Sequence, residues 1–113
     1  MTDLTITERA FESLADASLR ALERALHECE LGFEADLQNG ILTIEFEDGS
    51  KYVLNSHRAA RQIWMAAERA AWHFDYDDKT LQWITTKGRD ELWTTLESVL
   101  SRKVKSSVVL PRP

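Results

Sequence analysis

Residues 39–55 read NGILTIEFEDGSKYVLN, two strand-like runs that each follow a turn dipeptide. The first dipeptide is Asn39-Gly40 and the second is Asp48-Gly49. Both dipeptides favour tight hairpin turns, because the central positions of such turns need a positive φ angle. The stretch therefore predicts neighbouring antiparallel strands joined by tight turns.

Strand-like patterns extend to both sides of this stretch. Phe33, Ala35 and Leu37 alternate with polar residues, which is the period of a half-buried strand. We expect about six strands, at residues 33–38, 41–47, 50–55, 62–66, 72–76 and 81–85. The Ala-rich segment 66–71 is too short for a stable helix, and we expect a loop there. The runs predict an antiparallel meander.

Helical periodicity appears before and after the meander. Apolar residues recur every three or four positions in residues 5–30, with Thr7 as the expected N-cap and Gly32 as the expected stop. The same spacing returns after Gly88, where we expect Asp90 and Glu91 in the first helical turn. We predict an α+β fold, a two-layer α/β sandwich with two helices packed on one face of the sheet. Residues 1–105 should form the domain and 106–113 a flexible C-terminal tail.

Composition limits the class of function. The chain has 113 residues, a net charge of −5 and no apolar run near the roughly 20 residues that span a bilayer. An excess of acidic residues speaks against binding to nucleic acid or anionic membranes. Cys29 is the only cysteine, and Met1–Leu4 resemble neither a secretory nor an organelle signal. We expect a cytoplasmic protein.

A first candidate site is a stripe of carboxylates. Helical geometry places one set along a single edge of the first helix, with His27 beside it: Glu8, Glu12, Asp16, Glu23 and Glu30. Glu34 and Asp36 continue it on the outward face of the next strand. Oxygen ligands without a shaped cage suit Fe²⁺, Mn²⁺, Mg²⁺ or Ca²⁺ with weak, unselective affinity. A solvated helix face has the same spacing and, on spacing alone, is the commoner explanation.

A second candidate is an exposed aromatic residue. In residues 62–66, alternation puts Ile63 and Met65 on one face and Trp64 on the other. If the helices cover the first face, Trp64 faces solvent, where tryptophan often anchors protein interfaces. The inverted register, with Trp64 buried, is the open alternative.

Signs of catalysis are missing from the pattern. The three histidines, His27, His57 and His73, lack the spacing of a zinc site, and no serine lies in a nucleophile-elbow context. We expect no catalytic residues and no enzyme.

Several sequence segments occur in the order and with the spacing typical of one protein family, which gives these patterns a common explanation. Besides residues 39–55, they are Arg61-Gln-Ile-Trp-Met65, Trp72-His-Phe-Asp-Tyr76 and Gln82-Trp-Ile84. From about Phe11 to Leu100 the chain resembles the bacterial frataxin (CyaY-type) family.

The resemblance implies an iron-binding accessory and regulator of iron–sulfur cluster assembly. It implies weak, non-selective binding of iron (Fe²⁺ or Fe³⁺) at an acidic ridge, here Asp16, Glu23, Glu28, Glu30, Glu34 and Asp36. His27 could add an imidazole ligand between Glu23 and Glu30, although Arg24 and His27 stand where bacterial members often have acids. It also implies docking on cysteine desulfurase, with the cluster scaffold protein as a further partner, through Asn55, Gln62 and Trp64.

Two other functions remain to be separated from this one. An iron-oxidising or iron-storage protein would need inward-facing carboxylate and histidine ligands, whereas the sequence offers a surface stripe. A single-strand nucleic-acid module could use Trp64 for stacking, but the net charge opposes it. We expect a monomer and leave open whether excess iron makes it oligomerise.

Overall fold

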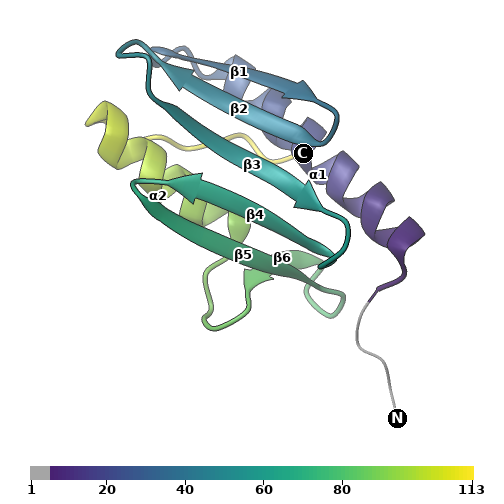
Figure 1. The fold of residues 1–113 in the computed structure, drawn as a ribbon. Helices are drawn as coiled ribbons and strands as arrows, with labels where there is room; N and C mark the ends of the chain where they lie inside the picture. The colour runs from purple at the N-terminus through teal and green to yellow at the C-terminus, as the bar shows by residue number, and fades with distance from the viewer. Residues whose placement is uncertain (1–5) are drawn as a thin grey trace.

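The computed structural model of the chain describes residues 6–113. The elements, in chain order, are α1 (Glu8–Glu28), β1 (Phe33–Gln38), β2 (Ile41–Phe46), β3 (Lys51–His57), β4 (Gln62–Ala67), β5 (Ala70–Asp77), β6 (Gln82–Thr85) and α2 (Leu92–Val104). The strands form one antiparallel sheet in the order β1 to β6. Both helices lie behind the sheet in Figure 1, on the same face. The predicted two-layer sandwich is confirmed.

The first helix starts at a side-chain cap. Thr7 has an extended backbone, and its hydroxyl oxygen accepts a hydrogen bond from the Ala10 N–H at 3.1 Å. The predicted N-cap is confirmed, whereas Thr5, the earliest expected helical residue, lies outside the described residues. The helix ends at Glu28, and Cys29 rather than Gly32 caps it.

Two of the hairpins follow the sequence signals to different degrees. Asn39 and Gly40 have φ angles of 51° and 76°, so they form the predicted tight turn between β1 and β2. Between β2 and β3 only Gly49 has a positive φ, 85°. This connection spans residues 47–50, and Asp48 Oδ1 accepts the Ser50 N–H at 2.9 Å. The tight turn predicted at Asp48-Gly49 is therefore a wider loop.

The predicted loop at 66–71 is wrong. Strands β4 and β5 continue through this segment and leave only Glu68 and Arg69 as the turn. Both residues have left-handed φ angles, 53° and 62°, which residues other than glycine and asparagine rarely adopt. Arg102 of α2 binds both carboxylate oxygens of Glu68 at 2.7 Å. A contact distant in sequence thus supports a turn that the local residues do not signal.

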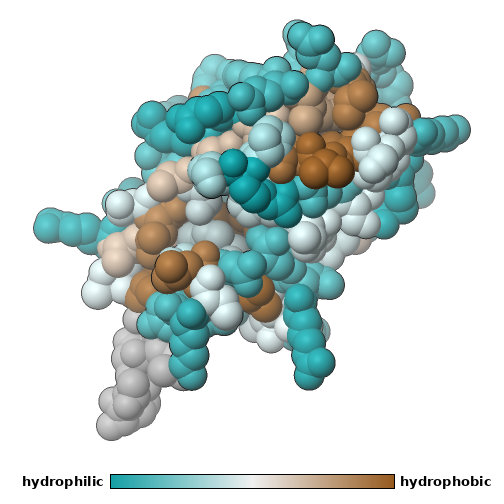
Figure 2. Space-filling model, turned by 180° about the vertical axis from the view of Figure 1, so that it is seen from behind, coloured by the Kyte–Doolittle hydropathy of each residue, from teal (hydrophilic) through white to brown (hydrophobic). Residues whose placement is uncertain are grey.

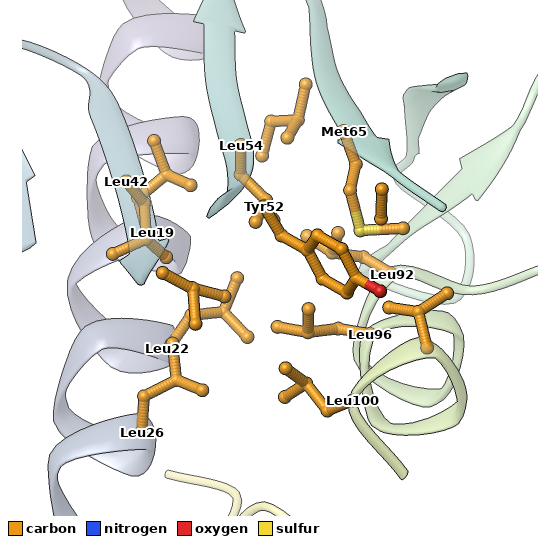
Figure 3. Close-up of a cluster of buried hydrophobic side chains, with 14 of the residues drawn as sticks. Leu19, Leu22, Leu26, Leu42, Tyr52, Leu54, Met65, Leu92, Leu96 and Leu100 are labelled. Atoms are coloured by element: carbon orange, nitrogen blue, oxygen red, sulfur yellow. The ribbon is translucent and has the colours of Figure 1, made fainter. Parts of the chain in front are cut away.

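The core lies between the sheet and the two helices (Figure 3). Leucines of α1 and α2 meet the inward residues of the central strands, among them Leu19, Leu22, Leu42, Leu54, Met65, Leu92 and Leu96. Each of these side chains is at most 1% exposed. Burying one such side chain contributes about 1.5–3 kcal/mol. Because the helices cover one sheet face, the alternate residues of every strand point to the uncovered face.

The start of α2 differs from the prediction in one detail. Asp90 and Glu91 precede the helix instead of lying in its first turn. Glu91 is the N-cap, and its carboxylate accepts the N–H groups of Trp93 and Thr94 at 2.8 and 3.1 Å. The carboxylate still neutralises the positive helix end, but from the cap position.

Residues 106–113, expected to be a flexible tail, make packing contacts. Val108 and Leu110 are 3% and 1% exposed and belong to the core cluster. Glu97 of α2 accepts the Leu110 N–H at 2.7 Å and forms an ion pair with Arg112. These contacts attach the end of the chain to α2.

Seen from the helix side, the surface is largely hydrophilic, with hydrophobic residues gathered in separate areas (Figure 2). None of the helices within residues 6–113 is long and apolar enough to cross a membrane.

Candidate functional site

The N-terminal half of the acidic stripe is paired with arginines. Arg58, from the turn after β3, contacts Glu12 at 2.5 Å and Glu8 at 3.4 Å. Arg20 Nε lies 2.8 Å from Asp16 Oδ2, one helical turn away. Exposed pairs of this kind contribute about 0–1 kcal/mol to stability. Their main consequence is that this half of the stripe, the predicted ligand Asp16 included, is largely neutralised.

Farther along α1, Glu23 and His27 contact the edge of the sheet. Glu23 Oε2 accepts the Leu37 N–H at 3.0 Å, and His27 Nε2 donates to the Ala35 carbonyl at 2.8 Å. Strand β1 is an edge strand, so its outer N–H and C=O groups need partners from outside the sheet. These two side chains supply those partners and attach α1 to β1.

Glu28 lies on another side of the helix. It lines a hollow with Arg24 and with Pro111 and Arg112 of the C-terminal tail. The structure therefore does not bring Glu28 together with the other predicted ligands.

Unpaired acidity gathers instead around the first two strands. We call Glu30, Glu34, Asp36, Glu45 and Glu47 the β1–β2 acidic patch. Four of its members, all except Asp36, line an open hollow of about 560 Å³ beside Phe33 and Phe46. An adjoining hollow of about 420 Å³ is lined by Glu34, Asp36 and Glu45, with Lys51 as its one cationic side chain.

The strand register puts like charges opposite each other within this patch. Glu34 and Glu45 are direct cross-strand partners, and both are exposed. Directly opposed like charges destabilise a sheet. Lys51 of β3 is the partner of Glu45 on its other side and offsets part of this repulsion. Glu34, Asp36 and Glu45 therefore leave net negative charge on the uncovered face.

The predicted metal residues are thus only partly brought together. Glu30 and Glu34 share one hollow, and Glu34 and Asp36 share the next. Within residues 6–113, the structure contains no cluster of three or more His, Cys, Asp or Glu side chains that could hold a metal ion. Sequence reasoning missed Glu45 and Glu47, although the Asn39-Gly40 turn and strict alternation would have placed Glu45 opposite Glu34.

The second candidate lies in the middle of the uncovered face. Ile63 and Met65 are 0% and 1% exposed, so of the two registers that the sequence left open, the structure has the one in which Trp64 points away from the helices. Trp64 is half-buried, and Asn55 of β3 is its direct cross-strand partner. The Trp64 Nε1–H donates to Gln62 Oε1 at 2.7 Å. The three predicted partner-binding residues are therefore contiguous.

Two histidines that the partner prediction did not include cover the faces of the indole. The His57 ring centroid lies 3.9 Å from that of Trp64 and the His73 ring centroid 4.3 Å from it, with interplanar angles of 14° and 16°. A signal was present, because alternation puts His57 on the same face of β3 as Asn55, and His73 on the same face of β5 as Asp75.

The single cysteine is not placed as a thiolate ligand. Cys29 is partly buried behind the end of α1, and its Sγ lies 3.9 Å from the Val109 carbonyl oxygen. Burial, and secondarily the charges of Glu28 and Glu97, raise the pKa of the thiol. The group therefore stays protonated at neutral pH and is a poor nucleophile or metal ligand.

Comparison with known proteins agrees with this architecture. Residues 4–106 match the family model described as a frataxin-like domain. The chain belongs to the frataxin family. Frataxin-family relatives include the iron-sulfur cluster assembly protein CyaY of Ralstonia nicotianae, 34% identical over 109 residues, which are 93% of this chain and 95% of the relative. The CyaY protein of Pseudomonas fluorescens is 32% identical over 97 residues, 86% of this chain and 88% of its own.

Solved structures give the same result for the fold. Frataxin from Psychromonas ingrahamii superposes with a TM-score of 0.83 at 27% identity, covering 91% of this chain and 96% of its own. A trimeric yeast frataxin complexed with ferrous iron has a TM-score of 0.64 at 20% identity, covering 93% and 92% of the two chains, and shows the shared fold only. The match to the frataxin-like family model ends at residue 106, so most of the C-terminal segment 106–113 lies beyond it.

Proposed function

We propose that this frataxin-family chain is a cytoplasmic, non-catalytic accessory of iron–sulfur cluster assembly that binds iron weakly and regulates a cysteine desulfurase by docking on it. The place in cluster assembly is supported by relatives named for that process, which align with nearly all of the chain. The two binding activities are supported by the site itself.

The iron-binding surface of this proposal is the β1–β2 acidic patch. Its carboxylates are exposed around open hollows, so a bound ion would have few protein ligands and would keep much of its water. Such sites bind hard divalent cations weakly and with little selectivity. The yeast protein that shares this fold is complexed with ferrous iron, which fits an iron ligand. Asp16, Glu23, His27 and Glu28 are outlying members of the proposed site, because each is paired elsewhere or lies on another surface.

The docking surface of this proposal is the uncovered sheet face around Trp64. The observation that carries it is that Trp64, Asn55 and Gln62 are contiguous on a face that neither α1 nor α2 covers (Figure 1). Small and apolar residues, Val53, Ala66 and Ala71, continue this face toward Thr43 of β2. The β1–β2 acidic patch adjoins this face at Thr43: Asp36 is the direct cross-strand partner of Thr43, and Glu45 lies two residues farther along β2. This arrangement suits a partner with a basic surface.

A pull-down from a bacterial lysate under reducing conditions tests this function. Wild-type protein should recover a cysteine desulfurase, with or without the cluster scaffold protein, and the Trp64→Ala variant should recover much less. Wild-type bait that recovers neither protein, or equal recovery by the variant, would rule out docking through this face. Rapid oxygen consumption on adding Fe²⁺ would instead favour the iron-oxidising alternative.

A further inference from the structure

The indole of Trp64 is the middle ring of a three-ring stack on the uncovered face. His57 of β3 covers one side and His73 of β5 covers the other, and both rings lie within about 16° of parallel to the indole. A partner therefore cannot stack on either face of Trp64 while the stack is intact. Only the outer edge of the indole is available for contact.

Hydrogen bonds fix the orientation of this edge. The Trp64 Nε1–H donates to Gln62 Oε1 at 2.7 Å, and Gln62 Nε2 donates in turn to Asp75 Oδ1 at 3.0 Å. The polar atom of the indole is thus satisfied within the chain. What Trp64 presents is an apolar edge held in one place by its neighbours.

The two outer rings of the stack can change charge. Imidazole is the side chain that ordinarily gains a proton between about pH 8 and pH 5. His57 Nδ1 accepts the Ala60 N–H at 3.2 Å, so the neutral ring carries its proton on Nε2 and protonation breaks this turn contact. A protonated imidazole over an indole face gains a cation–π interaction, which favours retention of the stack. Protonation therefore adds positive charge beside Trp64 without displacing it.

Few other charges surround the stack. On the neighbouring strands the groups beside the rings are the neutral Asn55 and Gln62, and the charged Asp75. The turn after His57 carries Arg58 and Arg61.

On the other side, His73 lines an open hollow of about 590 Å³. Lys87 and Asp90, from the segment before α2, line the same hollow. Arg58 is paired with Glu8 and Glu12, so the remaining cations, Arg61 and Lys87, are offset by Asp75 and Asp90. One or two added protons would make the charge around Trp64 positive.

We propose that His57 and His73 are positioning residues that present Trp64 edge-on to its partner and, by gaining protons, weaken docking on a basic surface as the pH falls. This inference rests on the proposed docking function. Its physical basis is that an acidic face meeting a basic partner loses electrostatic complementarity when cations appear at the anchor.

Affinity measurements at two pH values test the docking half of the inference. Wild type and the double variant His57→Phe/His73→Phe would each be titrated with purified cysteine desulfurase at about pH 8 and about pH 6. Phenylalanine keeps an aromatic ring on each side of Trp64 but cannot titrate, and titration of the partner is common to both proteins. The wild-type Kd should rise roughly threefold or more beyond the change seen for the variant. Equal pH dependence of the two proteins would overturn the proposal.

A measurement on the free protein tests the stack half and does not depend on the partner. The NMR resonance of the Trp64 Nε1–H should shift with imidazole titration in wild type, and the shift should shrink in the single variant His73→Phe. A resonance that stays constant from about pH 8 to about pH 5.5 would refute the stack as a proton-responsive unit. If the wild-type protein binds no desulfurase at both pH values, the proposed function and the docking half of the inference are refuted together. The pH dependence of the Trp64 Nε1–H resonance would still test whether the stack responds to protons.

Discussion

Removing the charge of Glu34 should stabilise the fold and weaken cation binding at the same time. Glu34 lies directly opposite Glu45, and a like-charge pair in that position costs about 0.2–1 kcal/mol. Lys51, on the other side of Glu45, offsets part of the repulsion, so we expect Glu34→Gln to gain about 0.2–0.5 kcal/mol. For a domain of this size that corresponds to a rise in Tm of about 1–3 °C.

Thermal unfolding at low and high salt measures the first effect, and NMR broadening by Mn²⁺ measures the second. The gain in stability should vanish near 1 M salt, where the screening length falls to about 3 Å. In the variant, Mn²⁺ should broaden the amide resonances of the β1–β2 acidic patch less than in wild type. Glu28→Gln is the matched control for the second effect, because Glu28 lies outside the patch and its removal should leave the Mn²⁺ broadening of the patch resonances unchanged. A lower Tm for Glu34→Gln at low salt, or unchanged Mn²⁺ broadening, would refute the reasoning.

Three further predictions concern stability and can be checked by denaturant unfolding. Leu110→Ala should destabilise the protein by about 2–5 kcal/mol because Leu110 is 1% exposed, whereas Val109→Ala, at a side chain 74% exposed, should change stability by less than about 0.5 kcal/mol. Arg69→Gly should stabilise by about 0.5–1 kcal/mol, since glycine adopts the left-handed φ of this turn residue without steric cost. Burial opposes ionisation of Glu97, but Arg112 and the Leu110 N–H outweigh burial and lower the pKa of the Glu97 carboxyl. The stability that the ionised Glu97 contributes should therefore be lost as the pH falls below about 4.5, and this loss should be smaller in Glu97→Gln.

The sequence predicted the sandwich because its strongest signals are local and consistent. The Asn39-Gly40 turn, the alternation that buries Ile63 and Met65, and the Thr7 cap each act within a few residues, and the structure confirms all three. Where local signals were weak, the prediction failed. The turn at Glu68 and Arg69 carries no glycine or asparagine, and Arg102, more than 30 residues away, supports it.

In the candidate site, too, local patterns predicted which residues share a face, whereas contacts with other elements were not predictable. Helical periodicity placed the carboxylates of α1 on one edge, but it could not show that Arg58 would pair with Glu8 and Glu12. Nor could it show that Glu23 would bond to the β1 backbone. Partners that approach from other elements decide which carboxylates stay uncompensated. Alternation did place Trp64 on the face opposite Ile63 and Met65, whereas the stacking of two histidines on it depends on the register of three strands.

The most direct test of the proposed function is the affinity of Trp64→Ala for purified cysteine desulfurase, measured together with its Tm. We predict a loss of at least about 2 kcal/mol in binding, roughly 30-fold in Kd, with a stability loss of only about 1 kcal/mol from the broken stack. The control Ile63→Ala should instead lose about 2–5 kcal/mol of stability, because Ile63 is fully buried on the opposite face. Wild-type affinity in a folded Trp64→Ala protein would contradict docking through the uncovered sheet face.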